Sequence, residues 1–150
     1  MSENADLIKL YSGQILALAA DIPLTERLEN PQATVKRRAP LCGSTVTVDI
    51  VLKDGKIAAF GQDVKACALG QAAASVVGSN IIGRTIEEIR TARDQLSAML
   101  RDGAAAPAAP FDGLKVLEPA REFKNRHDSI MLALEATLEA CETACNSVCA

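Results

Sequence analysis

Residues 45–60 carry the pattern that most restricts the fold of this chain, a regular alternation of apolar and polar side chains. The apolar positions are Val46, Val48, Ile50 and Leu52, and the polar positions between them are Thr45, Thr47 and Asp49. A period of two places each set on its own face of an extended strand. The Asp54-Gly55 pair tolerates the positive φ angles of a type I′ turn, so residues 57–60 are predicted to return as an antiparallel strand. With a third strand predicted over residues 34–39, the sheet is small and antiparallel.

Helical segments are predicted before and after this sheet. Apolar side chains recur at helical spacing over residues 4–20, and Pro23 and Asn30-Pro31 then indicate a loop. After the hairpin, residues 66–77 are rich in alanine and lack strand alternation. We therefore expect a helix there, ended by Gly78-Ser79-Asn80.

The next helix has signals at both of its ends. Thr85 and Glu88 form a capping-box sequence at its start, and Asp102-Gly103 is predicted to stop it. Three segments follow: a linker over residues 104–110, a short apolar segment over residues 111–117, and a last helix from about Pro119 to at least Ala140. Strands first and helices after indicate an α+β fold, a three-stranded sheet packed against several helices in one domain.

Charge and cysteine content restrict the class of function. The chain has 16 Lys and Arg against 19 Asp and Glu, without a long basic run, so nucleic-acid binding is not expected. The apolar run at residues 15–20 is too short to span a bilayer, and no targeting segment is evident. An odd count of 5 cysteines without an export signal suits a reducing cytoplasm better than a disulfide framework. We expect a cytoplasmic protein that is not attached to a membrane.

Cys42 and Cys67 are the first candidates for chemistry. Cys42 stands between Pro40 and Gly43 in a turn that leads into a strand, which favours an exposed thiol. Cys67 lies at the predicted start of a helix, where unpaired N–H groups and the helix dipole favour the thiolate. The two cysteines bracket one hairpin and can meet at its open end. From spacing alone, a small buried hydrophobic side chain is an equally good interpretation of each.

His127 is the single histidine, and Asp128 follows it directly. Imidazole is a common ligand of zinc and iron, and a neighbouring carboxylate can orient the ring or bind the metal itself. A solvated polar turn at the start of a helix is the alternative, and the isolated sequence favours it.

Cys141, Cys145 and Cys149 recur every four residues and fall on one stripe of the last helix. Such a stripe is more often packing than a soft-metal site. If the helix is continuous, Cys141 lies roughly 20 Å from Asp128, at about 1.5 Å of rise per residue. The three cysteines therefore cannot join a site built around His127.

Taken in order, these elements resemble the NifU/IscU-like family of iron–sulfur cluster assembly scaffolds, which includes the SufU-type sulfur acceptors. The matching segments are Pro40-Leu41-Cys42-Gly43, Asp54-Gly55, Cys67 followed by Gln71-Ala72-Ala73-Ala74-Ser75, and Gly83-Arg84-Thr85. The resemblance covers about residues 34–140, and residues 141–150 form a cysteine-containing helical extension or tail. The ordered set of motifs is far more specific than any one of them.

The chain departs from the family pattern at four places, one of which is the N-terminal part, where the family's usual Asn-Pro-Arg-Asn stretch is absent. Ser44 stands where the family has an aspartate, and Ala66 stands where it has a glycine before the second cysteine. The third cysteine is missing, and the segment containing His127, Asp128 and Ser129 occupies its place. Aligning His127 with the family's histidine puts Asp128 at the lost cysteine, and a shift of one residue puts Ser129 there.

The resemblance implies a scaffold, not an enzyme, that binds iron or a [2Fe–2S] cluster for transfer to recipient apoproteins. Its implied ligands are Cys42, Cys67 and His127, with Asp128 as a fourth candidate. The same set also suits tetrahedral zinc, so a zinc-bound sulfur-transfer protein is the alternative. Both versions imply a cysteine desulfurase as a partner. The loss of the third cysteine leaves Cys42 or Cys67 to accept sulfur, or requires another protein to supply it. A family member that serves only as an interaction module is a third interpretation.

Overall fold

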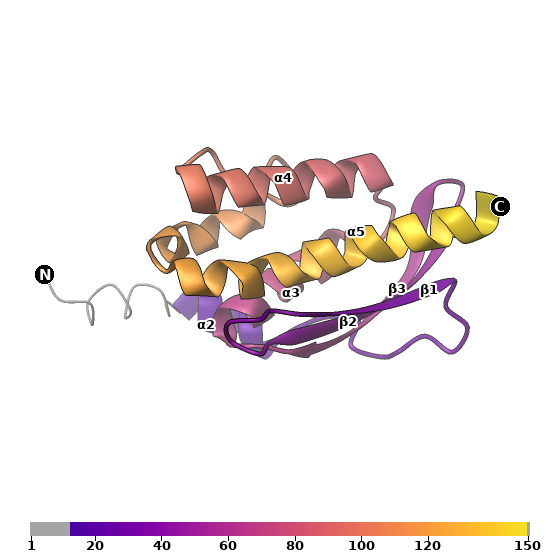
Figure 1. The fold of residues 1–150 in the computed structure, drawn as a ribbon, viewed down its shortest axis with the longest axis horizontal. Helices are drawn as coiled ribbons and strands as arrows, with labels where there is room; N and C mark the ends of the chain where they lie inside the picture. The colour runs from indigo at the N-terminus through magenta and orange to yellow at the C-terminus, as the bar shows by residue number, and fades with distance from the viewer. Residues whose placement is uncertain (1–12, 150) are drawn as a thin grey trace, which may run out of the picture.

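A three-stranded antiparallel sheet forms one side of the molecule (Figure 1). The computed structural model describes residues 13–149, with side chains described through residue 146. The strands are β1 (Ala33–Arg38), β2 (Thr45–Lys53) and β3 (Lys56–Lys65), in the order β1-β2-β3. Thr45 pairs with Arg38 on one side and with Lys65 on the other. The β1–β2 connection and the end of β3 therefore lie at the same end of the sheet.

The β2–β3 turn at the opposite end has the predicted geometry. Asp54 and Gly55 both have positive φ, 55° and 77°, as a type I′ turn requires. The register of the pair shifts between Val51 and Leu52, which marks a bulge just before the turn.

Helices cover one face of the sheet. Their bounds are α2 (Gly13–Ala20), α3 (Ala68–Asn80), α4 (Ile86–Asp102) and α5 (His127–Cys149). Helix α5 runs along β1 and β2, and α3 and α4 pack against it from the other side (Figure 1). The order of strands and helices confirms the predicted α+β class. No helix among residues 13–149 combines the length and the apolar character needed to cross a membrane.

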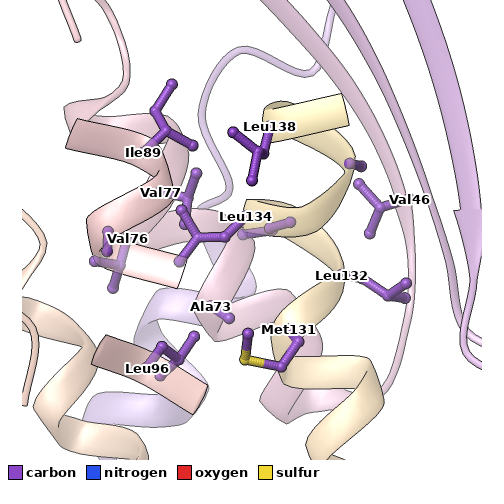
Figure 2. Close-up of a cluster of buried hydrophobic side chains, with 14 of the residues drawn as sticks. Val46, Ala73, Val76, Val77, Ile89, Leu96, Met131, Leu132, Leu134 and Leu138 are labelled. Carbon is purple, nitrogen blue, oxygen red and sulfur yellow. The ribbon is translucent and has the colours of Figure 1, made fainter. Parts of the chain in front are cut away.

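The core surrounds α5. The sheet packs on one side of this helix, and α3 and α4 pack on the other. Figure 2 shows Leu132 of α5 beside Val46 of the sheet, whereas Leu134 and Leu138 point toward the other helices. The run from Ile130 to Leu134 is buried at every position. A helix that is apolar on all sides is one that other elements enclose, which explains this sequence.

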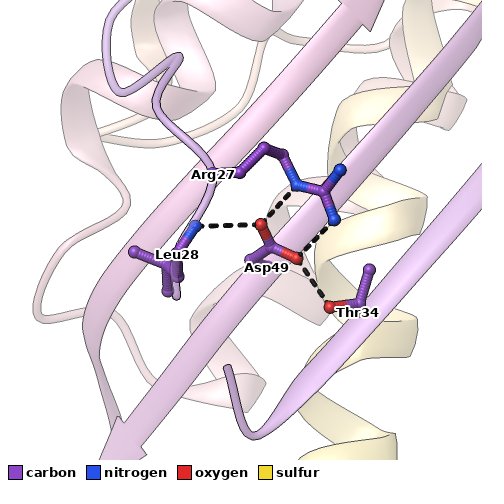
Figure 3. A network of polar contacts seen from close by, with 4 residues as sticks. All are labelled: Arg27, Leu28, Thr34 and Asp49. Atoms are coloured by element: carbon purple, nitrogen blue, oxygen red, sulfur yellow. Dashed lines mark hydrogen bonds and ion pairs between the residues drawn. The ribbon is translucent and has the colours of Figure 1, made fainter. Parts of the chain in front are cut away.

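The polar face of β2 is covered by the segment between α2 and β1. The Asp49 side chain is fully buried and accepts hydrogen bonds from Nε of Arg27 at 2.5 Å and from Nη2 of Arg27 at 3.0 Å (Figure 3). The Leu28 amide donates to the same carboxylate at 3.1 Å, and the Thr34 hydroxyl donates at 2.6 Å. Gly61, the β3 partner of Asp49, leaves room for this segment, because a Cβ there would collide with the backbone of residue 26. The loop is thereby tied to the middle of the sheet.

Most predicted ends of elements are confirmed. Thr85 and Glu88 form both hydrogen bonds of the capping box, and Gly103 ends α4 with a left-handed φ of 71°. Helix α2 confirms the second half of the first predicted helix, and residues 4–12 of that prediction lie outside the described residues.

Three predicted boundaries are wrong. Strand β3 was expected to end at Phe60 but continues to Lys65, because it pairs with β2 as far as Thr45. The last helix begins at His127, not near Pro119, because the 3₁₀ segments η1 (Asp112–Glu122) and η2 (Lys124–Arg126) precede it. Helix α3 runs through Gly78 to Asn80, whereas Gly78 was expected to help end it. A Cβ at Gly78 would lie 2.7 Å from Nε2 of Gln62, so this glycine serves close packing and not a helix end.

Candidate metal centre

Cys42 lies in the turn between β1 and β2, at the end of the sheet opposite the hairpin turn. The Ala39 amide donates to the Ser44 carbonyl at 2.8 Å, and the Gly43 amide donates to the Ala39 carbonyl at 2.9 Å. Gly43 has a φ of 74°, which a residue with a side chain adopts only at a cost. This tight backbone directs Cys42 outward, and its side chain is exposed.

Cys67 occupies the N-cap of α3, two residues after the end of β3. Its backbone is extended, with φ −67° and ψ 170°, and its carbonyl accepts the Gln71 amide at 2.9 Å. Its side chain makes no capping hydrogen bond, so the partly buried thiol is not used to hold the helix start. The positive end of the helix dipole lies beside this sulfur.

Two serines connect the cysteines. The Ser129 hydroxyl, in the first turn of α5, donates to the Ser44 hydroxyl at 3.1 Å. Ser44 Oγ lies 3.1 Å from Cys42 Sγ, and Ser129 Oγ lies 3.5 Å from Cys67 Sγ. Segments far apart in the sequence therefore meet in one polar cluster of two thiols and two hydroxyls, which we call the Cys–Ser cluster (Cys42, Ser44, Cys67 and Ser129).

Gly70 makes the approach of α5 to this cluster sterically feasible. A Cβ at Gly70 would lie 2.5 Å from the Ser129 Oγ and 2.9 Å from the Cβ of Ala66. The glycine thus lets the first turn of α5 pack directly on the first turn of α3. Without this contact Ser129 would not reach Cys67.

The hydroxyls change the acidity of Cys42. Partial burial pushes the pKa of this thiol upward, but hydrogen bonds from the Ser44 side chain and amide and from the Ser129 hydroxyl outweigh that effect. The pKa of Cys42 is therefore lower than that of an ordinary cysteine. A thiolate is the form that binds metal and attacks sulfur, so the cluster contains one exposed sulfur prepared for either reaction.

His127 and Asp128 lie on a different side of α5. They line a cleft of about 600 Å³ together with the last turn of α4, including Arg101 and Asp102. His127 Nε2 lies 3.1 Å from the carbonyl oxygens of Ala120 and of the following residue. Among the described side chains, those of residues 13–146, no three His, Cys, Asp or Glu side chains gather closely enough to hold a metal ion. Ligation by His127 or Asp128 stays a prediction, and binding through Nε2 would require the ring to leave these carbonyls.

Ser129 is the residue that the sequence signalled only weakly. The resemblance left Asp128 and Ser129 as competing occupants of one position. Successive residues of a helix point about 100° apart, so a helix that begins at His127 turns Ser129 toward the cysteines and Asp128 toward the cleft.

The cysteines near the C-terminus belong to another part of α5. Cys141 is fully buried, and burial raises the pKa of its thiol to about 12. Cys145 is partly buried, and the side chain of Cys149 lies outside the described residues. Cys141 thus packs as a small apolar side chain, the alternative that its spacing favoured.

Solved structures identify relatives of this fold, although no protein-family model and no curated protein matches the chain. A structure named as a nitrogen-fixing NifU-like protein (N-terminal) from Brucella abortus is 38% identical, with a TM-score of 0.90 over 93% of this chain and 96% of that chain. A SUF-system protein from Fervidobacterium islandicum, named as an iron–sulfur cluster assembly scaffold, is 20% identical with a TM-score of 0.77, covering 88% of this chain and 96% of that one. A hypothetical protein is 22% identical with a TM-score of 0.79, covering 89% and 97%.

The last two likenesses show the fold alone, whereas the first also shows descent. The first structure is 38% identical to this chain, and the match covers 93% of this chain. The chain belongs to the NifU-like family.

Proposed function

We propose that this protein is a scaffold that holds iron and sulfide, or a nascent [2Fe–2S] cluster, at Cys42 and Cys67 before transfer to other proteins. The observation that carries the proposal is the Cys–Ser cluster, where two thiols from separate elements meet through Ser44 and Ser129. Membership in the NifU-like family and the fold shared with a named iron–sulfur scaffold support it.

The chemistry of the cluster suits cargo that must leave again. Thiolates are the usual ligands of iron–sulfur clusters, and the lowered pKa of Cys42 favours that form. Serine hydroxyls bind iron less readily than thiolates, so Ser44 and Ser129 act here by hydrogen bonding to sulfur. Because Cys42 is exposed, the cargo remains accessible to an acceptor protein.

The proposed role requires partners and no turnover by this chain. We expect a cysteine desulfurase to supply sulfur and recipient apoproteins to take the finished cluster. Cys42 is better placed than Cys67 to accept sulfur, because it is exposed and hydrogen bonds stabilise its thiolate. Its sulfur would attack the outer sulfur of a persulfide, and the broken S–S bond would release the donor thiolate.

The test is anaerobic reconstitution with iron and sulfide, followed by visible absorption. We expect sulfide-to-iron bands in the wild type and their loss in Cys42→Ser and in Cys67→Ser. Cys145→Ser is the matched control, because position 145 lies about 24 Å along α5 from Ser129 at roughly 1.5 Å per residue. His127→Ala reports separately on the predicted imidazole ligand. Unchanged bands in a Cys42→Ser, Cys67→Ser double variant would reject the proposal.

A zinc-bearing sulfur-transfer protein is the second candidate, and the stabilised Cys42 thiolate favours it equally. This candidate predicts tightly held zinc without acid-labile sulfide, and stimulation of a desulfurase that disappears in Cys42→Ser. Metal and sulfide analysis of the purified protein therefore separates the two functions.

A further inference from the structure

Strand β1 is an open edge of the sheet, with which no described residue pairs on its outer side. It neighbours β2 alone in the strand order β1-β2-β3 (Figure 1). The opposite edge, β3, is covered by other parts of the chain. The Ile57 amide donates to the Arg84 carbonyl at 3.0 Å, and the Gln62 amide donates to the Leu24 carbonyl at 2.9 Å. Only the β1 edge is therefore available to another strand in the part of the chain that the structure describes.

The backbone of β1 offers the groups that a further strand needs. The Ala39 amide donates to the Ser44 carbonyl at 2.8 Å, so these residues form a hydrogen-bonded pair that continues the register of β1 and β2. In an antiparallel ladder, hydrogen-bonded pairs alternate with pairs whose N–H and C=O groups point away from each other. The amides and carbonyls of Thr34, Lys36 and Arg38 therefore point away from β2, toward the open edge.

Two cationic side chains make this edge basic. Lys36 and Arg38 are exposed, and neither has a carboxylate partner among the described residues. Arg37 lies between them and points to the opposite face, where it contacts Glu135 at 3.2 Å and Glu139 at 2.6 Å. Two unpaired cations thus stand two residues apart on an open strand, in a chain whose net charge is −3.

These features favour one kind of occupant. Cations on an edge strand oppose pairing with a like edge, so a second copy of this chain is disfavoured there. Single-stranded nucleic acid is held by stacking on aromatic side chains as well as by charge. Strands β1 and β2 contain no aromatic residue, and Phe60 of β3 is buried. An extended peptide segment with acidic side chains matches both the backbone groups and the charges.

We propose that the open edge of β1 binds an extended acidic segment of a partner protein, which joins the sheet as an additional strand. Its backbone pairs with Thr34, Lys36 and Arg38, and carboxylates two residues apart, about 7 Å along the strand, reach the two cations. Arg38 leads into the turn that contains Leu41 and Cys42, and Leu41 is 70% exposed. The segment thereby brings its protein to the exposed thiol of the Cys–Ser cluster.

The first test is binding of a labelled, end-blocked peptide of alternating glutamate and valine to the full chain, measured by fluorescence anisotropy. We expect binding that a peptide of alternating lysine and valine does not show. The Lys36→Glu, Arg38→Glu double variant should bind the acidic peptide roughly tenfold more weakly, because two attractions become repulsions. The Lys53→Glu, Lys115→Glu double variant is the matched control, since it changes the net charge equally at exposed positions outside β1.

Amide hydrogen exchange distinguishes strand addition from charge attraction alone. In the free protein we expect fast exchange at the amides of Thr34, Lys36 and Arg38. The amides of Val35 and Arg37, which bond to β2, should exchange slowly. The acidic peptide should slow the first set. A backbone N-methylated version keeps the carboxylates but cannot donate to the strand, so it should bind roughly tenfold more weakly.

Three results would overturn the proposal. The first is equal binding of the acidic peptide by the wild type and the Lys36→Glu, Arg38→Glu variant, or equal binding of the N-methylated peptide. The second is slow exchange of the edge amides in the free protein, because the edge would then already be occupied by the chain itself or by a second copy. The third is displacement of the peptide by an equal concentration of a single-stranded oligonucleotide, which would assign the edge to nucleic acid.

This binding site and the proposed scaffold function are tested separately. The peptide experiments use no iron or sulfide, so their failure would leave the scaffold proposal in place. Failure of the anaerobic reconstitution would likewise leave the β1 edge as a binding site for an acidic segment.

Discussion

Ser44 and Ser129 give Cys42 a polar environment that Cys141 lacks. Both hydroxyls hydrogen-bond toward Cys42, whose pKa is lowered although burial opposes the change. Cys141 has no comparable surroundings, and burial raises the pKa of its thiol to about 12. The thiol of Cys42 should therefore form a thiolate at a lower pH than the thiol of Cys141, because their neighbours differ.

Alkylation should be faster at Cys42 than at Cys141. We expect Cys42 to react with iodoacetamide at a lower pH than an unperturbed cysteine, and Cys141 to remain unmodified in the folded protein. Ser44→Ala should shift the reaction of Cys42 to higher pH, because it removes a hydrogen bond to the thiolate. The measurement is the pH dependence of the alkylation rate by peptide mass spectrometry. Ser97→Ala, in α4, is a control that should leave the profile unchanged.

Asp49 should make the stability of the fold depend on pH. Burial opposes ionisation, but hydrogen bonds from Arg27, Thr34 and the Leu28 amide outweigh it and lower the pKa of this carboxyl. A lowered pKa in the folded state adds stability above the unfolded value of about 3.9, and this stability is lost as the pH falls through the folded value.

The change that tests this is Asp49→Asn. At pH 7 we expect the free energy of unfolding to fall by about 2–3 kcal/mol, since charge-assisted hydrogen bonds to a buried carboxylate are lost. As the pH falls through the lowered folded-state pKa of Asp49, the difference from wild type should shrink, because Asp49 is then protonated in both states. Urea unfolding across this pH range measures it, with the half-exposed Asp63→Asn as the control. A constant difference at every pH would contradict the assignment.

The contact between α3 and α5 is the element pairing on which the candidate site depends most. Gly70→Ala would place a methyl group 2.5 Å from the Ser129 Oγ, so the helices must separate or Ser129 must move. We expect a loss of about 1–3 kcal/mol in the free energy of unfolding, as for other overpacked cores. We also expect weaker cluster binding, because Ser129 then leaves Cys67.

Gly13→Ala provides the matched comparison for Gly70→Ala. Gly13 is also helical, and a Cβ there meets nothing within 4 Å. That substitution should be neutral or stabilising by up to about 1 kcal/mol, since alanine favours helix more than glycine does. Equal losses in the two variants, measured by urea unfolding, would argue against a specific helix contact at Gly70.

Elements with local signals were predictable from the sequence. The Asp54-Gly55 turn, the capping box at Thr85 and the left-handed Gly103 each depend on a few adjacent residues, and all three are present. The start of α5 has no such local signal. It is set by η1 and η2, whose positions depend on packing against other elements, including α4 and α3 for η1. Gly78 was misjudged because its role is contact with Gln62, a residue on a different element.

Across the whole molecule, the candidate site exists only because three elements end at one place. The β1–β2 turn, the start of α3 and the first turn of α5 meet there, and α5 is fixed by the sheet on one side and by helices on the other. The sequence and its family resemblance were sufficient to select Cys42 and Cys67. They did not separate Asp128 from Ser129, since one residue of helical rotation decides which side chain faces the cysteines.

The most direct test of the account is the iron and acid-labile sulfide content of protein purified anaerobically from cells. The comparison requires the wild type, the Cys42→Ser, Cys67→Ser double variant, and Cys145→Ser as the control. The account predicts equal amounts of iron and sulfide in the wild type and in the control, and neither in the double variant. Iron and sulfide retained by the double variant at the wild-type level would contradict it.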